Sequence, residues 1–523
     1  MAGFYLVQGG TTLKLVTTSG GLTSLTLPTG VTLDSSKRMR GVVVNGLAVL
    51  VNSPSENLTV DRFGNVRILC PRPPSAAPVL SATASGSLTG TYTDWITYFI
   101  EDLFGNIIAE SYFSPISNSQ AVSSEYLTTT LPLSNQDITG RKLYRSTTNG
   151  TTKFPWFDIK DNTQTSIYDD LSDASLQLIA APTDLGTPPS FEIVASWKDR
   201  LWGKSADDVD TLYYSGINKP YGFPSTNTIP IPPKNNDYAG ITGFVPRKDI
   251  LGVGRRDSLH RITSSGNNVF TRVSEAEGIG IWATDSVQVI HDVGYFLGNP
   301  FGIYTWGSGV TNISNPKVKA WFETDTYFNR SRFDKAIGMY DPTTHSYVLF
   351  ISAAGSTDLD RWIQYDIAND TWWGPHKTGE FTPTFCATLR DGNDIAIAVI
   401  GGSDGKLYKT QTTKTDGSST AIDFDVTTTF VSAGNPNTMK LWLQPVVRTK
   451  VQSDGDLTIT PTVGDTDASA GSAITHDMTL GSETLRRLGK GELCKLRFRE
   501  TTAGQSVVIY GIELPFNEIG YRS

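Results

Sequence analysis

The feature that most constrains this fold is a strand plan that recurs along the chain. Segments 192–216, 240–264 and 285–309 each read as strand, turn, strand, polar loop and strand, and later segments repeat the plan with altered loops. The repeat spacing is roughly 40–50 residues, as in propeller blades. A four-stranded sheet of this kind cannot bury both of its faces alone, so such units stack in a ring. The repeat predicts a β-propeller.

The plan is interrupted once, by a module with a different rhythm. Residues 1–72 have the texture of propeller strands, but residues 76–185 read as short alternating strands between the proline-rich segments 71–78 and 182–189. Proline stiffens such linkers and stops strands from continuing. The propeller resumes over 190–412, and longer strands over 420–523 predict a C-terminal β-sandwich. The fold class is therefore all-β, with a propeller, an inserted β-sandwich and a terminal one. Helical periodicity is nearly absent, and the best candidates for short helices, near 315–324 and 482–488, have no sustained apolar stripe.

Composition limits the compartment and the partners. The 44 Lys and Arg are outnumbered by 52 Asp and Glu, a net charge of -8, which argues against tight sequence-independent DNA binding. No apolar run is long enough for a membrane span, and the first residues do not resemble a signal peptide. Cys70, Cys386 and Cys494 are far apart and odd in number, so we expect reduced thiols and folding in a cytoplasm.

No catalytic constellation emerges from the motifs. The five histidines have no metal-binding spacing, and phosphate-binding loops are missing, while a Ser-His-Asp triad stays open as an alternative. A propeller glycosidase would need paired carboxylates. Candidate acids stand at blade turns, where turn chemistry also favours Asp: Asp199, Asp207, Asp208, Asp292, Asp341 and Asp366. Tryptophans recur about once per blade, as expected for packing between blades: Trp197, Trp202, Trp306, Trp362, Trp372 and Trp373. The prediction is a protein without enzyme activity, cofactor, catalytic residue or metal.

Several short patterns in the interrupting module carry a resemblance. They are Tyr98, the turn EDLFGN at 101–106, Glu110 with Ser111, Ser114 with Pro115, GRKLYRS at 140–146 and YDD at 168–170. With them, the module is similar to the fibronectin type III-like modules of phage structural proteins. The resemblance implies that the insert is a fibronectin type III-like sandwich.

The flanking text carries a second resemblance. Residues 196–225, with RLW before YYS and a proline-rich loop, resemble a blade of the β-propeller tail hub or nozzle proteins of short-tailed bacteriophages, the podovirus tail accessory proteins of the packaged-DNA-stabilisation type. The ending IYGIELPFNEIGYRS, residues 509–523, is similar to the closing strands of that family. The resemblance extends over nearly the whole chain in texture and arrangement.

That resemblance implies a structural component of the virion tail, assembled in the bacterial host cytoplasm. A homohexameric ring would form the nozzle at the distal end of the head-to-tail connector, below the portal and its adaptor protein. Its lumen would pass double-stranded DNA during ejection and help retain the genome before it, and its surface would dock tail fibres or spikes. The family supplies no catalytic residues, and no membrane span is implied.

Candidate DNA-channel residues and two rival functions complete the expectations. Lys248, Arg255 and Arg256, on the second blade after the insert, are the candidates for a basic constriction, with solvated turn residues as the alternative interpretation. A receptor- or glycan-binding virion protein is the main rival function. A propeller glycosidase is the second.

Overall fold

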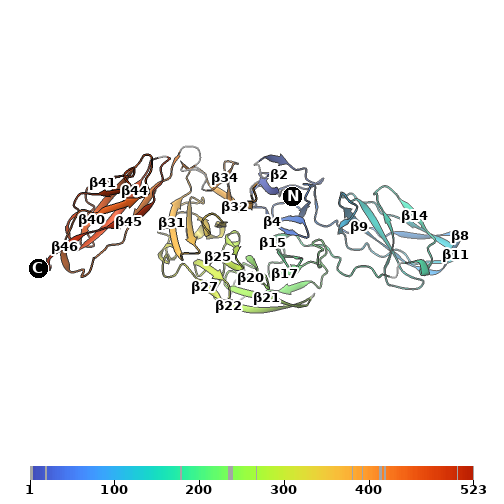
Figure 1. The fold of residues 1–523 in the computed structure, drawn as a ribbon. Helices are drawn as coiled ribbons and strands as arrows, with labels where there is room; N and C mark the ends of the chain where they lie inside the picture. The colour runs from blue at the N-terminus through green and yellow to red at the C-terminus, as the bar shows by residue number, and fades with distance from the viewer. Residues whose placement is uncertain are drawn as a thin grey trace. The chain divides into compact units, whose positions relative to one another are not determined.

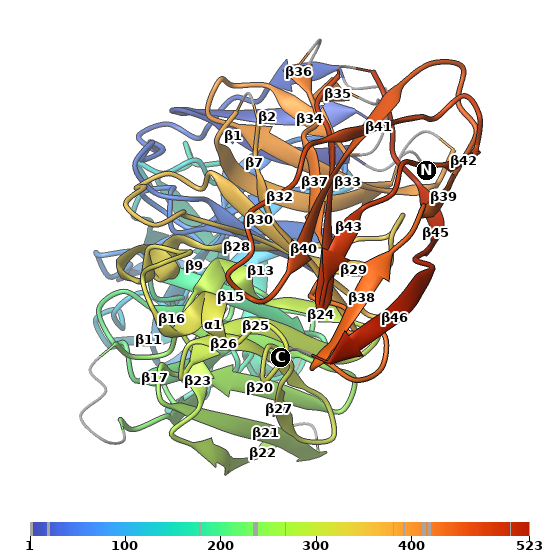
Figure 2. The same cartoon turned by 90° about the vertical axis from the view of Figure 1, so that its left-hand side faces the viewer.

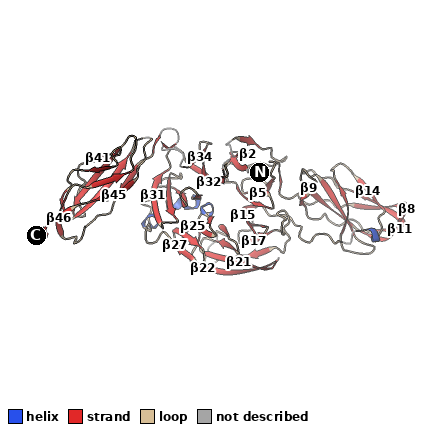
Figure 3. Cartoon of the chain, in the orientation of Figure 1, coloured by secondary structure: helices blue, strands red, loops and turns tan. Residues whose placement is uncertain are grey.

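The computed structural model is almost entirely β, with only short helical turns (Figure 3). It describes residues 4–17, 21–176, 179–233, 239–266, 268–379, 381–390, 393–410, 415–416, 420–502 and 504–521. Two compact units divide the chain: residues 1–376 with 385–399, and residues 377–384 with 400–523. No helix within these described ranges is long and apolar enough to cross a membrane. The predicted fold class is confirmed: a β-propeller, an inserted fibronectin type III-like sandwich and a C-terminal sandwich.

The propeller consists of small antiparallel sheets that follow one another around a common centre (Figure 1). The first three sheets are β1 (Phe4–Gly9), β2 (Thr12–Thr17) and β3 (Leu22–Ser24); β4 (Arg40–Val44), β5 (Leu47–Val51), β6 (Leu58–Val60) and β7 (Val66–Ile68); and β15 (Phe191–Trp197), β16 (Arg200–Ser205), β17 (Thr211–Tyr214) and β18 (Thr228–Pro230). The fourth holds β19 (Gly243–Pro246), β20 (Ile250–Gly254), β21 (Ser258–Gly266) and β22 (Val269–Glu277). In Figure 2 its last three strands lie side by side.

The remaining sheets carry the helical turns in their connections. The fifth sheet holds β23 (Gly280–Ile281), β24 (Gln288–Ile290), β25 (Val293–Asn299), β26 (Gly302–Trp306) and β27 (Val310–Asn312), with η2 (Thr284–Ser286) between its first two strands. After α1 (Ala320–Glu323) and η3 (Arg330–Lys335) come β28 (Ile337–Asp341), β29 (Ser346–Ile351), β30 (Arg361–Asp366) and β31 (Thr371–Lys377). The last sheet, β32 (Pro383–Arg390), β33 (Ala396–Gly402) and β34 (Leu407–Lys409), contains the division between the two units.

Buried apolar side chains between successive sheets explain why these strands need a ring. At each of the first five junctions, one buried cluster contains side chains from both neighbouring sheets: Leu13 and Leu50, Val49 and Phe191, Trp202 and Ile262, Val245 and Phe296, and Leu297 and Leu349. The last sheet continues the series, since Cys386 Sγ donates to the Gly338 carbonyl at 3.1 Å. Tyr5 on β1 donates its hydroxyl to the Arg390 carbonyl at 2.9 Å, which brings the first and last sheets together.

The insert is a two-layer sandwich between β7 and β15. One sheet has the order β10-β9-β12-β13 and the other β14-β11-β8. Their bounds are β8 (Val79–Tyr92), β9 (Asp94–Glu101), β10 (Ile107–Glu110), β11 (Gln120–Thr130), β12 (Gly140–Arg145), β13 (Phe154–Ile159) and β14 (Ser166–Asp169), followed by η1 (Asp173–Ser175). Buried Ile96, Tyr98 and Leu143 contribute to the core between the sheets.

The motif residues Ser111 and Ser114 have a structural role beside β9. Together with Ser117 they form a ladder along its edge, in which each backbone N–H donates to a β9 carbonyl, those of Tyr98, Ile96 and Asp94. Each serine hydroxyl also accepts the N–H of the same β9 residue, at 2.8–3.0 Å. The ladder satisfies backbone groups that an open strand edge would leave unpaired.

The insert is joined to the propeller by a buried apolar cluster. Ile100 and Ala109 of the insert pack with Leu185 and Tyr221, and Ile68 of β7 lies against them. The Gln136 side chain also binds the backbone of Arg72, accepting from its N–H at 2.7 Å and donating to its carbonyl at 3.0 Å. The insert therefore rests on the propeller through side-chain contacts as well as through its linkers.

The C-terminal sandwich has its own core, centred on buried Trp442, Leu457, Ile459, Leu496 and Phe498. Its strands are β35 (Thr415–Asp416), β36 (Thr420–Ala421), β37 (Phe424–Thr427), β38 (Thr438–Trp442), β39 (Val446–Thr449), β40 (Asp456–Gly464), β41 (Ile474–Asp477), β42 (Ser482–Thr484), β43 (Gly489–Gly491), β44 (Leu493–Glu500), β45 (Ile509–Glu513) and β46 (Phe516–Tyr521).

Two details qualify the sequence-based expectations. The helix expected near 482–488 is wrong, because residues 482–484 form β42, whereas the segment 315–324 does contain α1. In the family-like ending 509–523, residues 522 and 523 lie outside the described ranges.

Asp94 carries a buried, incompletely satisfied carboxyl group in the insert. Its Oδ2 accepts from the Thr129 hydroxyl at 2.8 Å, while Oδ1 is buried without a hydrogen-bond partner. Burial raises the pKa of Asp94 to about 7; the Thr129 bond and Arg145 oppose this, and the nearby Asp169 carboxylate adds to it. The folded insert therefore favours protonated Asp94.

We expect the insert to lose stability as pH rises through the interval between the ordinary pKa of 3.8 and the folded value of about 7. Asp94→Asn keeps the shape and removes the charge, so it should match the wild type near pH 4 and exceed it at pH 8 by on the order of 3 kcal/mol. Hydrogen exchange of β9 and β12 amides across this range measures the effect. Equal protection of both proteins at pH 8 would contradict it.

Candidate functional site

The middle of the propeller is the place to look for a site, and it is crossed by an ion-paired cluster whose side chains are partly exposed, 28% for Arg38, 24% for Arg40 and 16% for Asp285. Asp285, in η2 of the fifth sheet, accepts from Arg40 Nε at 2.7 Å and from Arg38 Nη1 at 2.5 Å. Arg40 begins β4 in the second sheet, and its Nη1 also donates to the Glu192 carbonyl of β15 at 3.2 Å. The second and fifth sheets are not neighbours in the ring, so these bonds cross its interior.

The two neighbouring arginines explain how Asp285 stays ionised in this position. Burial alone would raise its pKa, but the hydrogen bonds and positive charges of Arg40 and Arg38 hold the pKa below its usual value. One carboxylate binds two guanidinium groups, so replacement of Asp285 would leave both arginines without this shared partner. The cluster is therefore suited to joining sheets and unsuited to proton transfer at neutral pH.

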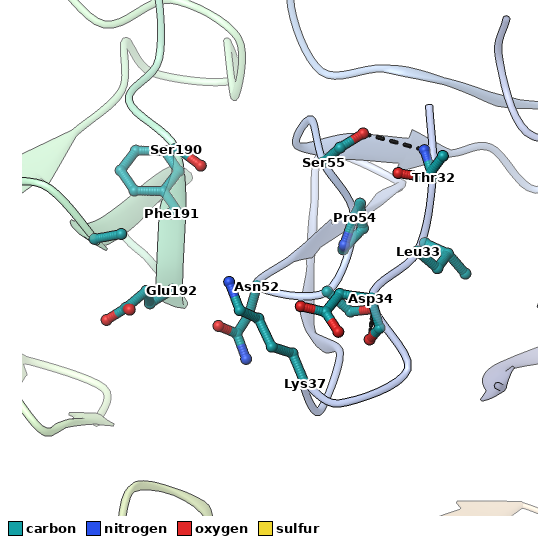
Figure 4. A pocket seen from close by; sticks show the side chains of 12 residues that line it. Thr32, Leu33, Asp34, Lys37, Asn52, Pro54, Ser55, Ser190, Phe191 and Glu192 are labelled. Atoms are coloured by element: carbon teal, nitrogen blue, oxygen red, sulfur yellow. Dashed lines mark hydrogen bonds between the residues drawn. The ribbon is translucent and has the colours of Figure 1, made fainter. Parts of the chain in front are cut away.

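A polar pocket opens between the second and third sheets (Figure 4). It has a volume of about 280 Å³; Ser190, Phe191 and Glu192 form one wall, and Thr32, Leu33, Asp34, Lys37, Asn52, Ser53, Pro54 and Ser55 line the other side, with Ala206 also contributing. Asn52 supports the wall by donating from Nδ2 to the Arg38 carbonyl at 2.7 Å. The pocket thus lies close to the central cluster.

The pocket offers hydrogen bonding more than acid–base chemistry. The Ser36 hydroxyl and N–H both donate to Asp34 and hold its pKa below the usual value. Glu192 forms an ion pair with Lys204. Both carboxylates are therefore suited to accept hydrogen bonds from a small polar molecule, and neither is arranged as the protonated acid that glycoside cleavage needs.

The acids singled out at blade turns serve the turns. Asp366 accepts from the side chain and backbone of Asn369, and these bonds lower its pKa. Burial opposes a similar lowering at Asp208, where hydrogen bonds that include one from Tyr213 prevail. Asp341 accepts from the Thr343 N–H, and Asp292 from the N–H of Lys248. Asp199 adopts a positive φ of 56° in the β15–β16 turn, and Asp207 donates its own N–H to the Ser205 hydroxyl.

Most of the recurrent tryptophans pack between or within sheets. Trp197, Trp202 and Trp306 are buried, and Trp372 is half-buried. Trp362 stacks on His376 with ring centroids 4.3 Å apart, and Trp373 is 53% exposed. The expected core role therefore holds for the buried members and fails for Trp373, which the outer strand β31 presents to solvent.

The three DNA-channel candidates do not form one basic patch. Lys248 is exposed in the β19–β20 turn, whereas Arg255 and Arg256 follow the other end of β20. Arg255 is fully buried and donates to Asp210 at 2.5 Å and to the Ile231 carbonyl at 2.9 Å. Arg256 lies 4.3 Å from the centroid of the Trp282 ring. The expectation for Arg255 is wrong, because its guanidinium is used inside the protein.

A hydroxyl–imidazole–carboxylate triad in the C-terminal sandwich escaped the sequence analysis. The Thr449 hydroxyl is 2.9 Å from His476 Nε2, and His476 Nδ1 is 2.9 Å from Glu483 Oε2. The order matches a catalytic triad. Thr449 and His476 are both buried, however, so a substrate cannot reach the hydroxyl. The triad instead ties β39 and β42 to β41 of the other sheet. Only the fold brings together residues 27 positions apart.

The cysteine thiols and the potential metal-binding side chains also give no sign of a reactive centre in the described residues. Burial raises the pKa of Cys70, Cys386 and Cys494, which keeps these groups as unreactive thiols at neutral pH. In the described part of the chain, no group of three or more His, Cys, Asp or Glu side chains is placed to hold a metal ion.

Comparison with known proteins gives only remote likenesses. No family model matches the chain, and no curated protein sequence matches it. Solved structures that resemble it include PorZ, a surface component of the type-IX secretion system of Porphyromonas gingivalis, at 9% identity and a TM-score of 0.26 over 98% of this chain and 80% of PorZ. An exo-β-1,3-galactanase of Phanerochaete chrysosporium has 9% identity and a TM-score of 0.19 over 97% of this chain and 96% of the enzyme. A glycoside hydrolase family 43 arabinoxylan arabinofuranohydrolase of Bacillus subtilis has 10% identity and a TM-score of 0.13 over 100% of this chain and 96% of that enzyme.

Substitution of Lys248 and Arg255 should separate a surface role from a structural one. Arg255→Met leaves the buried Ile231 carbonyl without this donor, while Asp210 is 43% exposed and can be solvated, so we expect a loss of about 1–3 kcal/mol, measured by hydrogen exchange in β20 and β21. Lys248→Ala should change stability by less than about 0.5 kcal/mol and weaken salt-sensitive duplex binding in a fluorescence-anisotropy titration. Unchanged stability of Arg255→Met would contradict its structural assignment, and unchanged DNA binding of Lys248→Ala would remove that residue as a channel candidate.

Proposed function

We propose that the chain is a structural subunit of the tail of a short-tailed bacteriophage, and that six copies form the nozzle ring at the distal end of the head-to-tail connector. The observation that carries the proposal is the bracing of the propeller from within, where Asp285 binds Arg38 and Arg40 across the ring. A ring held in this way is a rigid building block. The link to phage tails comes from the sequence at 196–225, which resembles a blade of that family, and from the fibronectin type III-like insert.

The chemistry of the acidic groups supports a role without catalysis. Carboxyl groups with a raised pKa, Asp94 and Asp169, lie inside the insert, where burial is the largest cause of the shift. Asp208 and Asp366 at the blade turns accept hydrogen bonds, and Glu192 in the polar pocket is ion-paired. A glycosidase needs one protonated acid beside one carboxylate in an accessible cavity, and this pairing does not occur among the acids described above.

In the proposed assembly the DNA passes between copies. The cross-ring ion pairs span the interior of each propeller, so in this assembly the lumen of the hexamer is formed by outer surfaces of several chains. A net charge of -8 suits a wall that repels phosphate and lets a duplex slide. An adaptor protein above the ring and fibres or spikes around it are the partners that such a position requires.

A second candidate function, receptor or glycan binding by a virion protein, is favoured by the polar pocket of about 280 Å³. Its lining of serine, threonine and asparagine groups beside Lys37 and Glu192 could exchange hydrogen bonds with the hydroxyls of a sugar. This function requires no sixfold ring.

Electron microscopy and mass measurement of the purified protein test the proposal. We expect hollow sixfold rings in negative stain and a particle mass six times the 56.8 kDa of one chain. Monomers at all concentrations up to those of a tail-assembly reaction, with saturable binding on a glycan array, would instead favour the second candidate. Lys37→Ala, at an exposed residue of the pocket lining, should weaken that glycan binding and leave ring formation unchanged, which separates the two functions.

A further inference from the structure

Two hairpin turns in different parts of the first unit share one sequence, Asp-x-Phe-Gly-Asn. One is residues 61–65, DRFGN, which connects β6 and β7 of the propeller. The other is residues 102–106, DLFGN, which connects β9 and β10 of the insert. The first belongs to the body and the second to the module that interrupts it.

The two turns have the same hydrogen bonds. Asp61 Oδ1 accepts the N–H groups of Phe63 and Asn65 at 2.8 and 3.0 Å, and its Oδ2 accepts from Asn65 Nδ2 at 2.7 Å. Asp102 receives the corresponding bonds from Phe104 and Asn106 at 2.8, 2.9 and 3.0 Å. The glycines have φ values of 85° and 81°, in the left-handed region that favours glycine.

Turn chemistry therefore explains the aspartate, the glycine and the asparagine, but it does not explain the phenylalanine. Phe63 contributes only its backbone N–H to the turn, and its side chain is 54% exposed. Phe104 is likewise bonded through its backbone and is 65% exposed. An exposed aromatic side chain at the same position of both turns calls for a separate reason.

The contact between the turns supplies that reason. The Phe63 and Phe104 rings lie against each other, with centroids 5.9 Å apart and planes at 52°. The Arg62 guanidinium lies 4.8 Å from the Phe63 centroid and 5.6 Å from the Phe104 centroid. Ile68, shortly after the first turn, and Ile100, shortly before the second, belong to the buried cluster that joins insert and propeller. The aromatic pair is the solvent-exposed rim of that junction.

We propose that the two Asp-x-Phe-Gly-Asn turns are a matched clasp through which the propeller recognises the insert and keeps it docked. The buried cluster supplies the apolar area, and the clasp fixes the insert at the rim, where two rings and one guanidinium meet. Because the contact is half-exposed, it is also the part of the junction that opens first when the insert separates from the propeller.

Cys70 gives a built-in reporter of this separation. Its thiol packs against the junction cluster and donates to the Glu110 carbonyl of the insert at 3.6 Å, whereas Cys386 and Cys494 lie elsewhere. Separation of the insert further exposes Cys70, which is half-buried in the docked state, whereas Cys386 and Cys494 are not part of the junction. The rate at which an alkylating reagent labels Cys70 in the full chain, followed by peptide mass spectrometry, therefore reports the population of the undocked state.

We expect Phe63→Ala and Phe104→Ala each to raise the Cys70 labelling rate about three- to tenfold, the range of an aromatic pair. The double variant should label no faster than the faster single variant, because the two changes remove one shared contact. Leu103→Ala is the matched control: Leu103 is 66% exposed in the same turn, and its replacement should leave the rate unchanged.

Three results would overturn the clasp. Unchanged Cys70 labelling in both single variants would mean that the rings do not stabilise the docked state. Multiplied effects in the double variant would mean that Phe63 and Phe104 act independently. Equal acceleration at Cys70, Cys386 and Cys494 would assign the turns to the stability of the whole chain. Circular dichroism of each variant confirms that it is folded, as expected for substitutions at exposed turn positions.

Discussion

The propeller depends on one carboxylate that is shared across its middle. Asp285 holds Arg38 and Arg40 of a sheet that is not its neighbour, so the ring is connected through its interior as well as around its circumference. Apolar packing between successive sheets buries apolar surface between them. Such packing alone, however, fixes each sheet only to its neighbours. The central ion pairs add a direct link between two sheets that are separated by others in the ring.

The appended sandwiches use polar groups in different ways. In the insert, the serine ladder covers the edge of β9. Burial of Asp94 there raises the pKa of its carboxyl group to about 7. In the C-terminal sandwich, Thr449, His476 and Glu483 reproduce the order of a catalytic triad but serve to connect its sheets. Burial decides between these roles, since the same three side chains at an open surface would be a candidate nucleophile, base and orienting acid.

Much of the candidate site was beyond the reach of sequence patterns. Arg255 looked like a basic turn residue, yet its burial and its bonds to Asp210 and Ile231 make it part of the core. Asp285 was visible only as the first residue of a repeated unit, because its partners Arg38 and Arg40 lie some 245 positions away on the far side of the insert. The shared Asp-x-Phe-Gly-Asn motif of the turns at 61–65 and 102–106 can be recognised in the sequence, but the contact between the two turns cannot be predicted from it.

Sequence by itself determined the all-β character, the repeated strand plan, the proline-bounded interruption and the turn chemistry, because alternation of side chains and the needs of glycine and aspartate act over a few residues. Tertiary structure decided which charges meet, which polar groups are buried and which turns touch. Those outcomes depend on ring closure and on the docking of one module against another, which bring together residues that no local pattern relates. Burial then set the chemistry of each group by changing the cost of its charge.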